Sequence, residues 1–292
     1  MLEYEYLKTD QRILSCLPER KTRSNKGTYG KVLCIAGSPD MAGAAYLCAW
    51  AAYRTGAGLV KILTPAENRL ILQNLLPEAL LSTFDTKAPD IRKVEEAFAW
   101  ADVAAAGPGL GKEPWACELT RMALARFRKP LVLDADSLNH LAEQEAFFEE
   151  RKEGELILTP HPGEFARLTG QRISAVTADI PGQAVRFARE KQCICVLKDA
   201  PTVTGDRTGI GYINTTGNNG MSTGGSGDVL TGIIAGLLAQ KTSALTAALL
   251  GVWLHGRAGD LAVRREGVYG MMARHLVEYL PEAMRERQEE QV

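Results

Sequence analysis

Short apolar runs alternate with longer segments of helical periodicity along most of this 292-residue chain. The apolar runs predict buried strands at residues 31–36, 59–63, 103–106, 131–133, 156–158 and 194–197. Each run ends in glycine, proline or polar residues, and a helical pattern usually follows, first at 42–55. Strands that alternate with helices favour a mainly parallel sheet with helices on both faces. We therefore predict a doubly wound α/β fold that binds its ligands beyond the carboxyl ends of the strands.

Two parts of the chain depart from this alternation. Residues 203–204 and 211–213 flank a polar turn and predict a β-hairpin. The last third is predicted to be helical, at 227–240 and 243–264. We expect one domain over 1–292, with an N-terminal extension at about 1–25 and a charged tail at 285–292 that frays.

Composition excludes several classes of protein. The net charge of −1 gives no bulk attraction to nucleic acid or to anionic membranes. The longest apolar stretches are interrupted before they reach membrane-spanning length, and the acidic N-terminus is no signal peptide. Six cysteines without a CxxC pair and four scattered histidines form no zinc pattern. We therefore expect reduced thiols in a cytoplasmic protein.

The most informative stretch is 218–232, where four glycines precede an apolar helical run. Gly220, Gly224, Gly225 and Gly227 allow a tight turn whose N–H groups point into one concavity, and the helix adds its positive end. This arrangement predicts a seat for phosphate. Asp228 stands at its mouth, which suggests a base that acts on a group beside the phosphate. The alternative is that Asp228 is a helix cap, but the crowded glycines favour the catalytic interpretation.

Four further features are candidates for ligand contact. The turn at 107–111 is not a GxGxxG motif and is equally consistent with a plain glycine turn. His161 lies between two prolines, either as a hydrogen-bonded turn residue or as a rigidly mounted ligand contact. Asp134 and Asp136 follow a strand, where one is expected to cap the next helix and either is able to approach a metal-bound phosphate. Lys198 either meets a phosphate or marks the solvated end of its strand.

Together these motifs resemble the ADP-dependent NAD(P)H-hydrate dehydratases, within the ribokinase-like superfamily. The motifs are KGTYGKVLCIAGS (26–38), LDADSLN (133–139), LTPHPGE (158–164) and GGSGDVLTG (224–232), and the resemblance extends from about 26 to 262. It implies a ribokinase-like three-layer α/β/α sandwich with a mainly parallel central sheet. It also implies repair of the S-epimer of hydrated NADH and NADPH. In that reaction ADP phosphorylates the hydrate hydroxyl, loss of phosphate regenerates NAD(P)H, AMP is released, and Mg²⁺ assists.

The resemblance further implies roles for individual residues. Asp228 is the expected base, and Gly225, Ser226 and Gly227 form the expected anion hole. The residues expected to contact the hydrate are Ala44, Gly109, His161 and Asp228. The residues expected to contact the nucleotide are Lys198, Asp199, Ala200, Pro201, Thr202, Gly225, Ser226 and Gly227. Related kinases have an Asn-x-x-Glu motif where this chain has His161 to Glu164, so Glu164 is expected in the Mg²⁺ shell through water or phosphate. Asp199 departs from the family, which commonly has glycine there.

Other functions and assemblies are also open at this point. A kinase for a small vitamin alcohol shares the anion hole but retains its phosphoester, and a nucleotide sensor binds without turnover. Helices at 44–53 and 246–261 hold more small and apolar residues than one buried face requires, which suggests a homo-oligomer. The resemblance suggests a homotetramer. An epimerase domain precedes this one in many family members, and here we expect the epimerase to be a separate protein.

Overall fold

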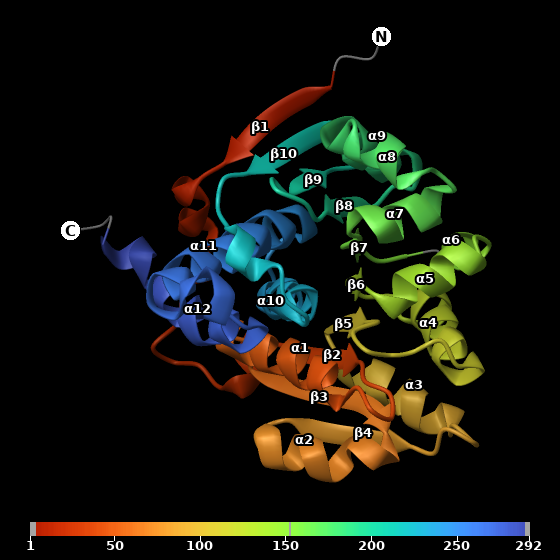
Figure 1. Ribbon diagram of the computed structural model, residues 1–292. Helices are drawn as coiled ribbons and strands as arrows, with labels where there is room; N and C mark the ends of the chain where they lie inside the picture. Colours follow the sequence, from red (N-terminus) through yellow and green to blue (C-terminus); the bar gives the residue numbers. More distant parts are fainter. Residues whose placement is uncertain (1–3, 152, 290–292) are drawn as a thin grey trace.

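The computed structural model describes residues 4–151 and 153–289. Within them, one sheet carries the strand order β1-β10-β9-β8-β7-β6-β5-β2-β3-β4 (Figure 1). Its strands are β1 (Glu5–Thr9), β2 (Lys31–Ile35), β3 (Leu59–Pro65), β4 (Leu80–Phe84), β5 (Val103–Ala106), β6 (Leu131–Leu133), β7 (Leu156–Leu158), β8 (Ile194–Leu197), β9 (Val203–Gly205) and β10 (Ile210–Asn214). Neighbouring strands are parallel, except that β9 is antiparallel to both β8 and β10. The predicted mainly parallel sheet and the predicted hairpin are both confirmed.

Helices cover both faces of this sheet. They are α1 (Ala42–Thr55), α2 (Arg69–Leu75), α3 (Ile91–Trp100), α4 (Pro114–Arg126), α5 (Asp136–Glu143), α6 (Phe147–Glu150), α7 (Pro162–Thr169), α8 (Ile173–Thr177), α9 (Ile180–Glu190), α10 (Ser226–Ala239), α11 (Ala244–Gly270) and α12 (Ala273–Glu289). Short 3₁₀ helices are η1 (Gln11–Cys16), η2 (Lys26–Tyr29), η3 (Ala66–Asn68) and η4 (Asn219–Met221).

The sheet separates two apolar cores, so the molecule has three layers. Val32 and Cys34 of β2 pack into the core formed with α1, α10, α11 and α12, whereas Leu33 and Ile35 face the core formed with α3, α4, α5, α7 and α9. Both faces of the central strands are therefore buried, which explains why these strands are continuously apolar in sequence. The predicted three-layer sandwich is confirmed.

Close packing of α10 against α1 fixes the start of α10 at the carboxyl edge of the sheet. A Cβ atom on Gly232 would lie 2.1 Å from the Cys48 carbonyl oxygen, and one on Gly236 would lie 2.7 Å from the Ala52 carbonyl oxygen. Only glycine permits this approach of the two backbones.

The order of the strands also brings two loops together. The chain passes from β2 to β3 and β4 toward one edge, and then returns to place β5 on the other side of β2. The N–H of Gly37, after β2, donates to the carbonyl oxygen of Pro108, after β5, at 2.9 Å. This reversal of strand order is where doubly wound sheets usually bind ligands.

The two ends of the chain differ from expectation. Helix α12 continues to Glu289, within the tail that was predicted to fray, while 290–292 lie outside the described residues. Glu286 pairs with Arg257 at 2.6 Å, and Arg287 donates to the Leu17 carbonyl oxygen at 2.5 Å, which holds this turn in place. At the other end, β1 pairs with β10 and adds a strand that was not predicted. No helix in the described part of the chain is long and apolar enough to cross a membrane.

Candidate active site

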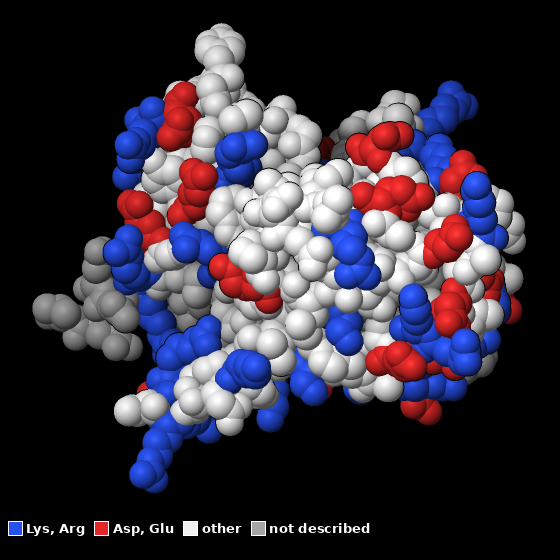
Figure 2. All heavy atoms as spheres, turned by 90° about the horizontal axis from the view of Figure 1, so that it is seen from below, with Lys and Arg blue, Asp and Glu red and all other residues white. Residues whose placement is uncertain are grey.

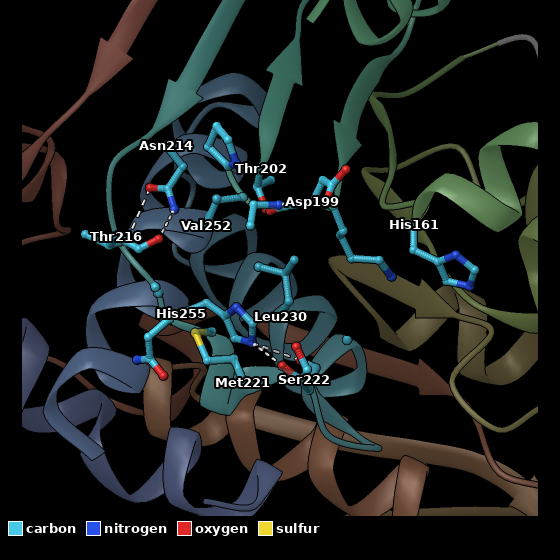
Figure 3. A pocket seen from close by; sticks show the side chains of 18 of the residues that line it. His161, Asp199, Thr202, Asn214, Thr216, Met221, Ser222, Leu230, Val252 and His255 are labelled. Atoms are coloured by element: carbon cyan, nitrogen blue, oxygen red, sulfur yellow. Dashed lines mark hydrogen bonds between the residues drawn. The ribbon is translucent and has the colours of Figure 1, made fainter. Parts of the chain in front are cut away.

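A cavity of about 910 Å³ opens at the carboxyl ends of β6, β7 and β8 and at the start of α10 (Figure 3). Most of the predicted site residues line it: His161, Glu164, Lys198, Asp199, Ala200, Pro201, Thr202, Ser226, Gly227 and Asp228. Segment 214–219 and helix α11 close the opposite side, where Asn214, Thr216 and His255 lie across from His161 in Figure 3. Its volume suits a nucleotide-sized ligand.

The start of α10 has the geometry of an anion site. Gly225 is the N-cap with a left-handed φ of 91°, and a Cβ atom there would lie 2.5 Å from Leu47 Cδ1, so only glycine fits. Within the described residues, the N–H groups of Gly227 and Asp228 have no protein acceptor. These free donors and the positive end of the helix favour a phosphate group.

Asp228 does not cap this helix. The N-cap is Gly225, and Asp228 occupies the third position of the first turn. Its carboxylate accepts no hydrogen bond from any described residue. Burial, followed by repulsion from Asp134, raises the pKa of Asp228 to about 7, against the attraction of Lys198. A carboxyl that titrates near neutrality at the mouth of an anion site is suited to act as a general base.

Lys198 joins two carboxylates beneath the cavity. Its Nζ lies 2.7 Å from Asp134 Oδ1 and 3.7 Å from Glu164 Oε2, and its side chain is only 19% exposed. Burial tends to lower the pKa of Lys198, but Asp134 and Glu164 outweigh it and the pKa is raised. Burial likewise tends to raise the pKa of Asp134, but Lys198 reverses the shift. The ion pair is therefore charged, and the interpretation of Lys198 as a solvated strand end is wrong.

The two aspartates after β6 do not cap α5 either. Its N-cap is Ala135, which makes no side-chain hydrogen bond to the helix. Asp134 also accepts a hydrogen bond from Thr231 of α10 at 2.8 Å, and Asp136 accepts one from the Gly111 N–H at 2.8 Å. Asp134 thus ties α10 to the strand ends, and Asp136 ties the glycine turn after β5 to the start of α5.

His161 combines both of the interpretations left open by the sequence. Its Nδ1 accepts from the N–H groups of Gly163 and Glu164 at 3.0 and 3.3 Å, while its own N–H donates to Glu164 Oε2 at 2.8 Å. This reciprocal pair is a capping box at the start of α7. Burial lowers the pKa of His161, so the ring is neutral with its proton on Nε2. The ring also lines the cavity, and its Nε2 lies 3.4 Å from Glu164 Oε1.

Ala44 and Gly109 lie together but are not part of this cavity lining. A Cβ atom on Gly109 would approach the Ala44 Cβ to 2.7 Å, so the two residues meet where the loops after β2 and β5 converge. The exposed Asp199 is on the cavity rim, and its Oδ1 accepts a hydrogen bond from the Ala200 N–H at 2.8 Å. The carboxylate that departs from the family pattern is thus turned toward its own backbone.

Two polar residues of α11 support the site and were missed by sequence reasoning. His255 Nε2 lies 2.9 Å from the Ser226 carbonyl oxygen, and burial lowers the pKa of His255 to about 4, so the neutral ring donates. Asp260 accepts hydrogen bonds from the Gly217 N–H and from Asn218 Nδ2, both at 3.0 Å. The sequence signal was a histidine and an aspartate in a helix that is mostly apolar from 244 to 263. They hold the loop before α10 and the first residue of α10.

Comparison with known proteins assigns the chain to a family. Residues 32–282 match the family profile described as NAD(P)H-hydrate dehydratase. The chain belongs to this family. The assignment agrees with the resemblance drawn from the four sequence motifs.

Individual relatives give the same result. The ADP-dependent (S)-NAD(P)H-hydrate dehydratase of Bacillus subtilis is 34% identical over 273 residues, covering 94% of this chain and 95% of that protein. The bifunctional NAD(P)H-hydrate repair enzyme Nnr of Moorella thermoacetica is 43% identical over 284 residues, covering 94% of this chain and 53% of that protein. The chain spans about half the length of the first curated relatives that it matches.

Solved structures confirm the fold. The ADP/ATP-dependent NAD(P)H-hydrate dehydratase of B. subtilis, co-crystallised with ATP and Mg²⁺, superposes with a TM-score of 0.85 at 31% identity. The match covers 98% of this chain and 99% of that one. Hydroxyethylthiazole kinase of Pyrococcus horikoshii, with a TM-score of 0.60 at 16% identity, shares the fold alone.

The carboxylates suit a metal ion only in combination with phosphate. The described residues contain no group of three or more His, Cys, Asp or Glu side chains able to hold a metal ion. Asp134 and Glu164 are both engaged by Lys198. Mg²⁺ is commonly bound by one or two carboxylates together with substrate phosphates and water. The cavity therefore fits an ion that arrives with a nucleotide and not one held in a protein cage.

Proposed function

We propose that this chain is an ADP-dependent (S)-NAD(P)H-hydrate dehydratase, a hydro-lyase that regenerates NADH and NADPH from their hydrates. The observation that supports the proposal is the buried carboxyl of Asp228 at the start of α10, with its pKa raised to about 7, in a member of this family. The proposed products are NAD(P)H, AMP and phosphate.

In the proposed reaction, Asp228 accepts the proton of the hydrate hydroxyl. The hydroxyl oxygen then bonds to the terminal phosphorus of ADP, and the bond from that phosphorus to the bridging oxygen breaks to release AMP. The free N–H groups of Gly227 and Asp228 stabilise charge on the transferred phosphoryl group. The lone pair of the ring nitrogen then forms a C=N bond, and the C–O bond to the phosphate breaks, which releases phosphate. Loss of a proton from the neighbouring ring carbon restores the C=C bond.

The remaining site residues bind and orient the two substrates in this proposal. The nucleotide lies along Lys198, Asp199, Ala200, Pro201 and Thr202, with its terminal phosphate at Gly225, Ser226 and Gly227. The hydrate contacts Ala44, Gly109, His161 and Asp228. Bound Mg²⁺ supplies neutralisation of phosphate charge, and Glu164 is the residue that we propose to hold it through water or phosphate.

A small-molecule kinase is the second candidate, because hydroxyethylthiazole kinase has the same fold and an anion site with a base suits phosphoryl transfer to any alcohol. The two functions differ in the fate of the phosphoester. A kinase accumulates it, whereas a dehydratase eliminates it.

The test is to incubate the protein with hydrated NADH, Mg²⁺ and ADP and to follow the nicotinamide absorbance. We expect the absorbance of NADH to return, with one AMP formed for each NADH. A parallel reaction with ATP identifies the preferred donor. Absence of any restoration with either nucleotide contradicts the proposal.

We further propose that the protein is cytoplasmic and assembles as a homotetramer. The small and apolar residues of α1 and α11 that suggested assembly pack inside the chain, against α10 and α12. The tetramer therefore rests on family resemblance. Light scattering at micromolar concentration tests it, and a monomeric mass contradicts it.

A further inference from the structure

A second cavity, of about 670 Å³, lies away from the catalytic one, between residues 17–20, the ends of α1 and α10, and α12. Four arginines line it: Arg20, Arg54, Arg285 and Arg287. Glu19 is the one acidic residue of the lining among the described residues. Figure 2 shows Lys and Arg side chains gathered along one side of the face that is seen from below. The cavity therefore has an excess of positive charge.

Three of the four guanidinium groups are positioned by backbone carbonyls and not by carboxylates. Arg20 donates to the Gly56 carbonyl oxygen at 2.6 Å and stacks on the Tyr29 ring with a centroid distance of 3.8 Å. Arg54 donates to the Glu278 carbonyl oxygen at 3.2 Å, and Arg287 donates to that of Leu17 at 2.5 Å.

None of the four arginines forms an ion pair with a carboxylate of the described residues. Each guanidinium carries five N–H donors, so most of them remain available. The cavity thus holds an uncompensated set of planar donors, the geometry that recognises phosphate.

Helices α1 and α10 separate this cavity from the anion site, because the two sites lie at opposite ends of this helix pair. Helices α1 and α10 each contain 14 residues, a length of about 21 Å. Ser226 and Asp228 begin α10 at the catalytic cavity, whereas Gln240, just past its end, lines the arginine cavity. One nucleotide phosphate chain cannot occupy both positions.

We propose that the arginine cavity is a second anion-binding site, for a small molecule that carries two or more linked phosphates. Its volume suits a ligand of nucleotide size, and an excess of arginine over carboxylate favours a multiply charged anion. The proposal is independent of the function assigned to the catalytic cavity.

The test is calorimetric titration with inorganic pyrophosphate and, separately, with ADP. The variant is Arg54→Gln/Arg285→Gln, because Arg285 makes no hydrogen bond to the described residues and Arg54 makes only long ones. The matched control is Arg264→Gln/Arg265→Gln, which removes the same charge from exposed positions of α11 outside the cavity. An unchanged circular dichroism spectrum and an unchanged Tm in both variants show that they are folded.

We expect wild type and control to bind one more equivalent of pyrophosphate than the cavity variant, or to bind that equivalent at least about tenfold more tightly. This difference should shrink as salt is raised. If the arginine cavity recognises linked phosphates alone, it binds pyrophosphate and ADP with similar affinity. If it binds ADP more tightly than pyrophosphate, it also recognises the nucleoside. Equal stoichiometry and affinity for pyrophosphate in all three proteins overturns the proposal. An equivalent of ADP that is lost in the cavity variant, with no such equivalent of pyrophosphate, also overturns it.

Discussion

Replacement of Asp228 by asparagine separates its proposed role as a base from any structural role. Asparagine keeps the size of the side chain but does not accept the hydroxyl proton. General-base catalysis contributes about 10²- to 10⁴-fold, so turnover should fall by that factor, equivalent to roughly 3–5 kcal/mol of barrier. Affinity for ADP should hold or rise, because a negative charge beside the anion site is removed.

The same substitution should stabilise the protein at alkaline pH. In the folded protein the Asp228 carboxyl has a pKa of about 7, whereas in the unfolded chain its pKa is about 4. Between these two pH values the folded state keeps a proton that the unfolded state has lost. Stability therefore falls as pH rises from about 4 to 7, and above pH 7 the full penalty, up to about 4 kcal/mol, is present. Asp228→Asn removes it, so its Tm should exceed that of wild type at pH 8 and match it near pH 4.

The assay is steady-state NADH formation together with ADP affinity and Tm at the two pH values. Asp90→Asn is the matched control, because Asp90 accepts from the Arg92 N–H as the N-cap of α3 and asparagine caps a helix about as well. This control should leave turnover and Tm near wild type. Turnover of Asp228→Asn within a few-fold of wild type would falsify the assignment of the base.

Three further predictions follow from the site. The rate kcat/KM should rise with pH through an apparent pKa near 7, because Asp228 must lose its proton, and a flat profile between pH 5 and 9 contradicts this. Asp134→Asn should shift that rise to lower pH, because the repulsion between Asp134 and Asp228 is lost while the attraction of Lys198 remains; an unshifted profile refutes this electrostatic coupling. The same substitution should lower the free energy of unfolding by about 3–5 kcal/mol in chemical denaturation, because Lys198 loses its buried partner. Gly225→Ala forces an alanine into a left-handed conformation against Leu47, so the free energies of ADP binding and of unfolding should each fall by at least about 1 kcal/mol. Gly224→Ala faces open space and should change neither quantity, so equal behaviour of the two variants argues against a rigid anion site.

The central strands were predictable because their continuously apolar sequences indicate burial on both faces of the sheet. Strands β5, β6, β7 and β8 have the predicted bounds, since each is apolar on both faces and ends in residues that break a strand. Edge strands lack this signal. In β1, four of five residues are exposed, and the strand is fixed by pairing with β10, which is distant in sequence. Helix α12 was not predicted for a similar reason, because its charged last turn is held by partners that are distant in sequence.

The candidate site was predictable where a motif is local. Glycines before a helix and an aspartate after them imply the anion site from the sequence, and the structure adds the raised pKa of Asp228 through burial and the approach of Asp134. The roles of Asp134 and Lys198 were open because their ion pair joins residues 64 positions apart. His255 and Asp260 act through contacts with loops that only the fold brings to α11. Local spacing carries no record of such contacts.

The most direct test of the account follows the phosphoryl group itself. Hydrated NADH is incubated with the protein, Mg²⁺ and ADP, and phosphorus NMR counts every phosphorus-containing product as the NADH absorbance is recorded. The account predicts one AMP and one free phosphate for each NADH formed, with no lasting phosphoester, and loss of all three in Asp228→Asn. A phosphoester that accumulates while the NADH absorbance stays low contradicts the dehydratase and identifies a kinase.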